Sequence, residues 1–151
     1  MKKGFFIVTV LIAVCISSCH KDNSGAGGWN FKGESYSAAS AVLSGSVGDS
    51  LIANDNQGNT LTFFFSRLPT HSGNYQVINY TARLDSNQLY IRFVNNNTSF
   101  YYFSTGNDNV DAKVTVSSSG KITILVSSVY LESYSSAIID SGQLTAVINQ
   151  Q

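Results

Sequence analysis

Hydrophobic and polar residues alternate along most of the chain after residue 28. In residues 29–37, Trp29, Phe31 and Gly33 would share one face of an extended segment, and the polar residues between them would share the other face. A period of two is typical of a strand with one buried face. Residues 29–37 therefore predict a half-buried strand, and the folded domain is expected to begin near Trp29.

Two hairpins are predicted by turn-rich segments that lie between apolar runs. Residues 50–54 and 60–67 flank the sequence DNQGN, and residues 113–116 and 122–126 flank the sequence SSSGK. Clusters of Asn, Asp, Ser and Gly between two such runs are typical of hairpin loops. Each pair of runs is therefore expected to form two antiparallel strands.

Further strands are predicted where β-branched and aromatic residues are dense. Such segments occur at residues 75–83, 88–94, 99–105 and 142–148. The single proline, in LPTHSGNY, marks a connection between strands. The poorly patterned segment 130–139 is expected to hold at most one short helical turn.

The frequency of strands and turns predicts the fold class. About nine or ten short strands with turn signals between them are typical of an all-β fold. We expect an antiparallel β-sandwich over residues 29–151 as a single domain, with a lipocalin-like β-barrel as the alternative. No internal repeat indicates a propeller or a solenoid.

The first eighteen residues follow a different pattern. A basic start at Lys2 and Lys3 precedes an apolar run over residues 4–16, and the small residues Ser17 and Ser18 follow it. This order is typical of a signal peptide. The apolar run is shorter than the roughly 20 residues that a helix needs to cross a bilayer. Residues 1–18 are therefore predicted to be a signal peptide, and an ordinary secretory signal is the alternative to a lipoprotein signal.

The sequence ISSC at residues 16–19 resembles the lipobox of bacterial lipoproteins, with Ile16 where Leu is commonest. In that family the cysteine sulfur is lipidated and the preceding peptide bond is cleaved. The resemblance implies that Cys19 carries the lipid and anchors the mature protein in a membrane. Several acyl chains make a firm anchor, whereas one is marginal. Residues 19–28, rich in Gly and Ser, would then be the lipidated cysteine and a flexible tether.

The segments WNFKGESYSA, LPTHSGNYQV, SSSGKITILVSSVYL and DSGQLTAVI are similar in texture to small single-domain β lipoproteins of Bacteroidetes-type bacteria. The resemblance implies the outer membrane as location. Lys21-Asp22 is similar to a charged signal for export to the cell surface. Residues 49–51, DSL, look like an O-glycosylation site of those bacteria. Most such families have no assigned activity, so the resemblance implies location and fold more than function.

Charge and cysteine content exclude several classes of function. Removing Lys2 and Lys3 with the signal peptide lowers the nine basic side chains to seven, against nine acidic ones. Nucleic acid binding needs clustered Lys and Arg, which the chain lacks, so no nucleic acid partner is expected. Cys15 would be removed and Cys19 lipidated. The mature chain would then have no thiol for a disulfide, a nucleophile or a zinc site.

Candidate catalytic groups are few. His71, in the loop that follows the proline, is the only histidine after the tether. It has no neighbour of matching type for a zinc site. The acidic residues lie mostly beside Gly, Asn or Ser in predicted turns, where Asp serves turn chemistry. No G-x-S-x-G motif or phosphate-binding loop occurs. No catalytic residue, cofactor or metal ligand is therefore assigned.

Two loops carry oxygen ligands of the kind that calcium prefers. Residues 106–112 contain Asp108, Asn109 and Asp111, and residues 54–59 have the sequence NDNQGN. Neither loop has the spacing of an EF-hand. Plain Asn/Asp turns are the favoured interpretation of both.

Aromatic residues are the one enriched class that suggests binding. Neighbouring residues on a strand point to opposite faces, so the runs FFF and FYYF must place some rings on the outer face. An exposed tyrosine such as Tyr90 or Tyr101 could stack on a sugar or pack against a protein. Complete packing of both faces inside the fold is the favoured interpretation, and an exposed tyrosine pair is the alternative.

Three functions are compatible with this sequence. The first is a non-enzymatic envelope lipoprotein that binds a protein or glycan through loops and exposed tyrosines. The second is a structural or accessory subunit of an outer-membrane or cell-surface complex. The third, and least favoured, is a small hydrolase that uses His71 with a loop carboxylate.

Overall fold

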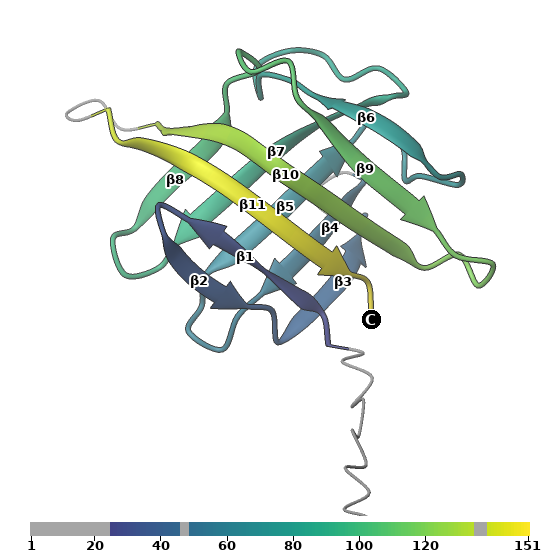
Figure 1. Cartoon of the computed structure of the whole chain (residues 1–151), viewed down its shortest axis with the longest axis horizontal. Coiled ribbons are helices and arrows are strands. Elements are labelled where there is room, and N and C mark those ends of the chain that lie inside the picture. Colours follow the sequence, from purple (N-terminus) through teal and green to yellow (C-terminus); the bar gives the residue numbers. More distant parts are fainter. Residues whose placement is uncertain (1–24, 46–48, 135–138) are drawn as a thin grey trace, which may run out of the picture.

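The computed structural model describes residues 25–45, 49–134 and 139–151 (Figure 1). Within these ranges the chain forms eleven β-strands and no helix, which confirms the all-β prediction. The strands are β1 (Gly27–Phe31), β2 (Glu34–Ser37), β3 (Ser40–Ser44), β4 (Ser50–Asn54), β5 (Thr60–Phe65), β6 (Gly73–Val77), β7 (Gln88–Asn95), β8 (Phe100–Ser104), β9 (Asp111–Val116), β10 (Ile122–Ser133) and β11 (Ser141–Asn149).

All described strands belong to one hydrogen-bonded sheet. Its order is β2-β1-β11-β10-β9-β6-β7-β5-β4-β3, and β8 pairs with both β7 and β10. In Figure 1 the strands β1, β2, β9, β10 and β11 cross in front of β3, β4, β5 and β7. The sheet thus folds over into two layers, and the two ends of its order, β2 and β3, are separated in the chain only by Ala38 and Ala39.

The strand pairing differs from the prediction in two respects. The described sheet has eleven strands where about nine or ten were expected. The β6/β7 pair is parallel, at Gln76 with Gln88 and Val77 with Leu89, whereas the other pairs are antiparallel. The parallel pair forms because the chain after β6 loops back to begin β7 at the same end of the sheet.

The single strand expected over residues 29–37 is wrong beyond Phe31. Lys32 and Gly33 have φ angles of 55° and 84°, so the chain reverses there and continues as β2. Positive φ at both central residues is typical of a tight hairpin turn. Trp29 and Phe31 are buried, as the alternation predicts, but Gly33 lies in the turn.

Both predicted hairpins are confirmed. β4 pairs with β5 across the DNQGN turn, and β9 pairs with β10 across the SSSGK turn. In the first turn the Asp55 carboxylate accepts hydrogen bonds from the backbone N–H groups of Gln57 and Asn59, both at 2.8 Å. Local side-chain chemistry of this kind explains why the turn could be recognised in the sequence.

Other boundaries depart from the sequence prediction. The strand expected over 75–83 ends at Val77. In the segment 130–139, for which at most one short helical turn was expected, Tyr130–Ser133 continue β10. Residues 135–138 lie outside the described residues. β3 had no recognisable signal, and β1 begins at Gly27, two residues before Trp29.

The core contains an aromatic cluster between the two layers. The Trp29 ring stacks on Tyr36 with centroids 5.4 Å apart, and Phe31 lies 5.1 Å from Phe93 and 4.7 Å from Tyr102. Aliphatic side chains from both layers extend this cluster along the sheet. Burial of large apolar side chains contributes roughly 25 cal/mol per Å² of apolar surface. This cluster therefore supplies much of the stability that the chain gains on folding.

A polar cluster covers one end of the aromatic core. The Asp140 carboxylate accepts hydrogen bonds from the Tyr102 hydroxyl at 2.7 Å and from the Ser141 N–H at 2.9 Å, and it pairs with Lys32 Nζ at 2.5 Å. These hydrogen bonds, that of Lys32 first and that of Tyr102 second, lower the pKa of Asp140. The cluster fixes the start of β11 against the β1–β2 turn. No helix in the described ranges is long and apolar enough to cross a membrane.

Candidate functional site

Aromatic side chains gather on the outer face of the layer formed by β5, β7 and β8. Phe63 and Phe93 point into the core, so their strand neighbours point outward. The pairings Phe64 with Tyr90 and Val94 with Tyr101 extend this outward surface across three strands. We call this surface the outer aromatic face; its rings are Phe64, Tyr80, Tyr90, Tyr101, Phe103 and Tyr134.

One half of the outer aromatic face is built around Phe64. The Tyr90 ring stacks on it with centroids 4.4 Å apart and an interplanar angle of 15°. The Arg92 guanidinium lies 5.0 Å from the Phe64 centroid, a cation–π distance. Together they leave Phe64 only 6% exposed. Burial raises the pKa of Tyr90 and the charge of Arg92 lowers it, with a net increase, so the Tyr90 hydroxyl is neutral at physiological pH.

The other half is more exposed. Tyr80 stacks on Phe103 at 4.3 Å, and Tyr134 meets the edge of Tyr80 at 5.8 Å. The Tyr134 backbone N–H donates to the Tyr101 carbonyl at 3.0 Å, which places these two residues side by side. Tyr101 is 52% exposed and Tyr134 is 77% exposed. These two rings are the accessible part of the outer aromatic face.

The two tyrosines singled out in the sequence thus lie on one surface but not in contact. Tyr90 precedes Val94 by four positions on β7, and Val94 pairs with Tyr101. A rise of about 3.3 Å per residue puts them about 13 Å apart along the strand direction. Tyr101 is exposed as proposed, whereas Tyr90 is half-buried by its stack on Phe64.

A polar cleft lies beyond Tyr90, where β7 begins. Its volume is about 620 Å³, and it is lined by Asn74, Gln76, Asp85, Ser86, Asn87, Gln88 and Asp111. Gln88 lies on the same outward face of β7 as Tyr90. This cleft could not be predicted from the sequence because its residues come from three separate segments, which the β6/β7 and β6/β9 pairs bring together.

Two side chains of the polar cleft, Gln76 and Gln88, are held by a chain of hydrogen bonds. The Asp85 N–H donates to Gln88 Oε1 at 3.0 Å, Gln88 Nε2 donates to Gln76 Oε1 at 3.3 Å, and Gln76 Nε2 donates to Asn109 Oδ1 at 3.4 Å. Each amide orientation is therefore set by its neighbour. The cleft presents ordered amides together with the carboxylates of Asp85 and Asp111.

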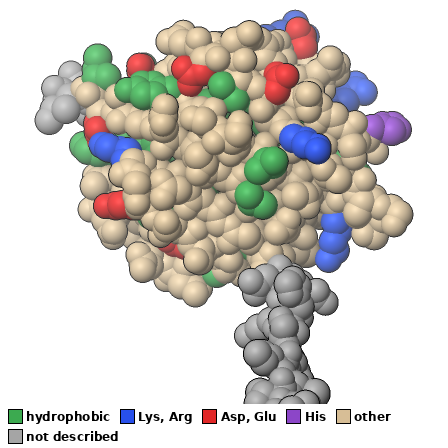
Figure 2. Space-filling view, in the orientation of Figure 1, with side chains coloured by type: hydrophobic (Ala, Val, Ile, Leu, Met, Phe, Trp, Pro, Cys, Tyr) green, Lys and Arg blue, Asp and Glu red, His purple; other side chains and the backbone are tan. Residues whose placement is uncertain are grey.

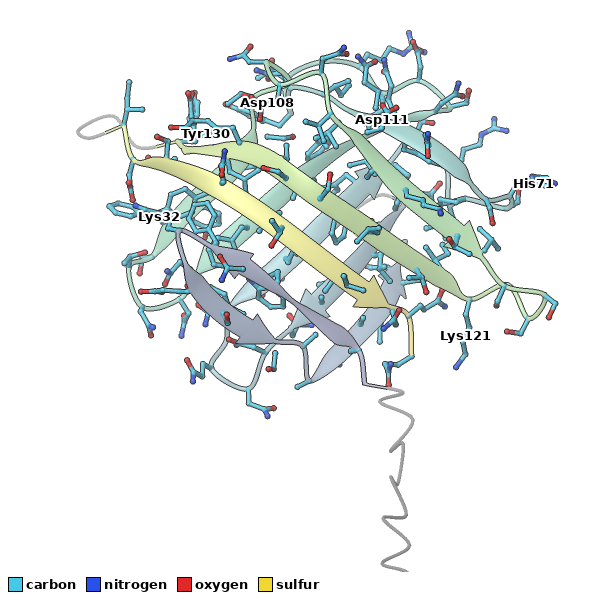
Figure 3. All side chains as sticks on the ribbon, viewed as in Figure 1. Lys32, His71, Asp108, Asp111, Lys121 and Tyr130 are labelled. Carbon is cyan, nitrogen blue, oxygen red and sulfur yellow. The ribbon has the colours of Figure 1, made fainter. Side chains whose placement is uncertain are left out.

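His71 lies away from both the polar cleft and the outer aromatic face. Figure 3 shows it pointing outward from the loop between β5 and β6. Its ring Nδ1 lies 2.9 Å from the Thr70 hydroxyl. In the described part of the chain, no carboxylate lies within ion-pair distance of His71. The carboxylate partner that a hydrolase would need is not brought to it.

In both candidate calcium loops, side-chain oxygens accept hydrogen bonds from the protein itself. Asp108 Oδ2 accepts a hydrogen bond from the Tyr130 N–H at 2.5 Å, whereas Asp111 lies at the start of β9 in the polar cleft (Figure 3). Asp55 binds N–H groups of its own loop. Among the described residues, no group of three or more His, Cys, Asp or Glu side chains could hold a metal ion.

Three features from the sequence analysis concern attachment and modification. Cys19 and the Lys21-Asp22 pair lie outside the described residues. Ser50, the acceptor in the DSL motif, is fully buried, and its hydroxyl donates to the Ser44 carbonyl at 3.3 Å. Glycosylation of Ser50 in the folded domain is therefore excluded by the lack of access.

The charged side chains on the face shown in Figure 2 are scattered among polar groups, with no patch of one sign.

The comparisons with known proteins add no further constraint: no family model, no curated protein and no solved structure matches this chain.

Proposed function

We propose that this chain is a lipid-anchored envelope protein whose β domain binds a glycan without catalysing a reaction. The anchor rests on the lipobox-like sequence that ends at Cys19. The binding role rests on one observation, the exposure of Tyr101 and Tyr134 beside the stacked rings of Tyr80 and Phe103. The proposed location is the outer membrane, with the β domain outside the bilayer.

Several physical features of the outer aromatic face favour a glycan. A tyrosine offers a flat apolar body and a polar tip, which suits the apolar face and the hydroxyl rim of a sugar ring. The Tyr80 ring stacks on Phe103, and the Tyr80 backbone N–H donates a hydrogen bond to the Ser104 carbonyl at 3.4 Å. Both contacts fix the position of Tyr80. Groups that are ordered before binding lose less conformational entropy in the complex. The face is therefore suited to a ligand that lies flat along it.

The absence of catalysis is proposed from the electrostatics of the same groups. A tyrosine nucleophile or base requires a lowered pKa. Burial, with a smaller contribution from Tyr134, raises the pKa of Tyr80, and burial also raises the pKa of Tyr90. These hydroxyls suit hydrogen bonding to a ligand rather than attack on it.

The test is binding of the full chain to an array of neutral and anionic glycans, compared with the double variant Tyr101→Ala/Tyr134→Ala. A sugar–aromatic stack contributes on the order of 1 kcal/mol per ring, so loss of both rings should cost about 2 kcal/mol and weaken binding roughly thirtyfold. Val147→Ala, which removes an exposed apolar side chain from the opposite layer, is the matched control. Equal binding by wild type and the tyrosine variant would reject the proposed site.

A second candidate function is that of an accessory subunit of an envelope complex. The observation that favours it is the edge strand β3, where Val42 is 46% exposed and Leu43 is 36% exposed. Edge strands carry unpaired backbone groups that can join another chain. Capture of an envelope protein that is lost in Val42→Lys, but retained in the tyrosine variant, would support this function instead.

A further inference from the structure

We infer that the polar cleft is a second subsite of the same surface and that it binds a neutral, polyhydroxylated sugar unit of the glycan. This inference rests on the proposed glycan-binding function. It adds the class of ligand and the residues that bind it. The groups assigned to the ligand are Asn74, Asn87, Asp85 and Asp111. Gln76 and Gln88, which bond to each other, line the cleft beside these groups.

The position of the cleft makes it continuous with the outer aromatic face. Gln88 and Tyr90 are two residues apart on the same face of β7, which is a separation of roughly 7 Å. Gln76 lies beside Gln88 in the parallel pair, and Asp111 lies beside Gln76 on the next strand. A chain that lies along Tyr90 in the direction of β7 would therefore reach Gln88 and the cleft within two residues.

The lining of the cleft matches the hydrogen-bonding needs of sugar hydroxyls. An amide side chain has two donor hydrogens and an acceptor with two lone pairs, so Gln76 and Gln88 keep capacity after bonding to each other. An ionised carboxylate accepts several hydroxyl hydrogens, and such charge-assisted bonds are stronger than neutral ones. No apolar side chain lines the cleft, so an apolar ligand has no matching surface there.

The charges of the cleft select against anionic sugars. In the described part of the chain, neither Asp85 nor Asp111 has a basic side chain within ion-pair distance. Lys113 lies on the same face of β9 as Asp111 and pairs with Asn74 across the strands, but it does not line the cleft. Two carboxylates without a paired cation repel a uronate or a sulfate, so the ligand that fits is neutral.

The experiment measures the affinity of the full chain for fluorescent cellohexaose, mannohexaose, xylohexaose and chitohexaose, and for hexagalacturonate as the anionic probe. Asp85→Asn/Asp111→Asn keeps the shape of the cleft and removes its charge. Asn74→Ala removes an amide that makes no hydrogen bond to hold the fold in the described structure. Glu34→Gln, an exposed carboxylate on β2, is the control, and Tyr101→Ala reports on the outer aromatic face.

At least one neutral hexasaccharide should bind at least about tenfold more tightly than hexagalacturonate. The double Asp variant and Asn74→Ala should each weaken that binding about three- to tenfold, at unchanged melting temperature, while Glu34→Gln should not change it. In the double Asp variant, the ratio of the affinity for the neutral hexasaccharide to the affinity for hexagalacturonate should also be smaller than in wild type. Binding should persist in EDTA, because the carboxylates are assigned to hydroxyls rather than to a calcium ion.

Two outcomes separate this inference from the proposed function. If Tyr101→Ala weakens binding while the cleft variants bind as wild type, the cleft subsite is wrong and the proposed function stands. If the wild type binds none of the probes, the proposed function fails and the inference with it. Loss of binding in EDTA, or tighter binding of hexagalacturonate, would overturn the neutral sugar assignment.

Discussion

The Asp140 carboxylate offers the sharpest stability test, because it joins the surface to the buried core. The perturbation is Asp140→Ala. It removes the acceptor of the Tyr102 hydroxyl, and Tyr102 is only 2% exposed. It also removes the pair with Lys32, whose side chain is 41% exposed. The hydrogen bonds from the Ser133 N–H to the Asp140 carbonyl and from the Asp140 N–H to Ser133 Oγ are left in place.

The magnitude is set mainly by the Tyr102 and Lys32 contacts; the Ser141 N–H, which also donates to the carboxylate, is part-buried. A hydrogen bond to a charged group contributes about 1.5–3 kcal/mol, and removing one partner leaves a buried polar group unsatisfied. An exposed ion pair contributes about 0–1 kcal/mol. Asp140→Ala is therefore expected to lower the free energy of unfolding by about 2–3 kcal/mol, with most of the loss from the Tyr102 hydroxyl.

The assay is urea unfolding followed by the fluorescence of the single tryptophan, Trp29, which is buried in the aromatic core. A double-mutant cycle of Asp140→Ala with Tyr102→Phe isolates the hydroxyl–carboxylate bond. Its coupling energy should be about 1.5 kcal/mol or more. Lys32→Gln is the matched variant for the ion pair and should cost less than about 1 kcal/mol. A coupling energy near zero, or equal losses in the Asp140 and Lys32 variants, would refute this reasoning.

Three further predictions concern the pH dependence of stability, the backbone at Gly106 and the lipid anchor. Because the folded pKa of Asp140 lies below its ordinary value, its contribution to stability is present above a pH of about 3.9 and is lost as the pH falls toward the folded pKa. Urea midpoints measured between pH 6 and pH 3 should fall less in Asp140→Asn than in wild type. Gly106 has a φ of 73°, and an added Cβ would lie 2.6 Å from the backbone nitrogen of Asn79. Gly106→Ala should therefore lower the free energy of unfolding by about 2 kcal/mol or more. Gly45→Ala, where an added Cβ would lie in open space, should change the free energy of unfolding little. Cys19→Ser should release the protein from the membrane to the soluble fraction, and continued membrane association would contradict the lipid anchor.

Much of the strand pattern could be predicted because it depends on neighbouring residues. Period-two alternation predicted the burial of Trp29 and Phe31, and local turn chemistry located the DNQGN and SSSGK hairpins. The Lys32–Gly33 turn was missed because Lys at the first central position lacks the Asn or Asp that usually marks such a turn. The parallel pairing of β6 was missed because a pairing direction leaves no mark within one strand.

The candidate site likewise has some features that local sequence determines and others that depend on strand pairing. Alternation along β5 and β8 by itself determined that these strands carry outward rings, including Phe64 and Tyr101. Only the tertiary structure decided that Tyr90 and Arg92 cover Phe64 while Tyr101 stays exposed, because covering a ring depends on the neighbouring strand. The polar cleft also required the tertiary structure, since its amides come from segments far apart in the chain. Side-chain direction is a local property of the backbone, whereas exposure and the assembly of a site depend on which strands pair.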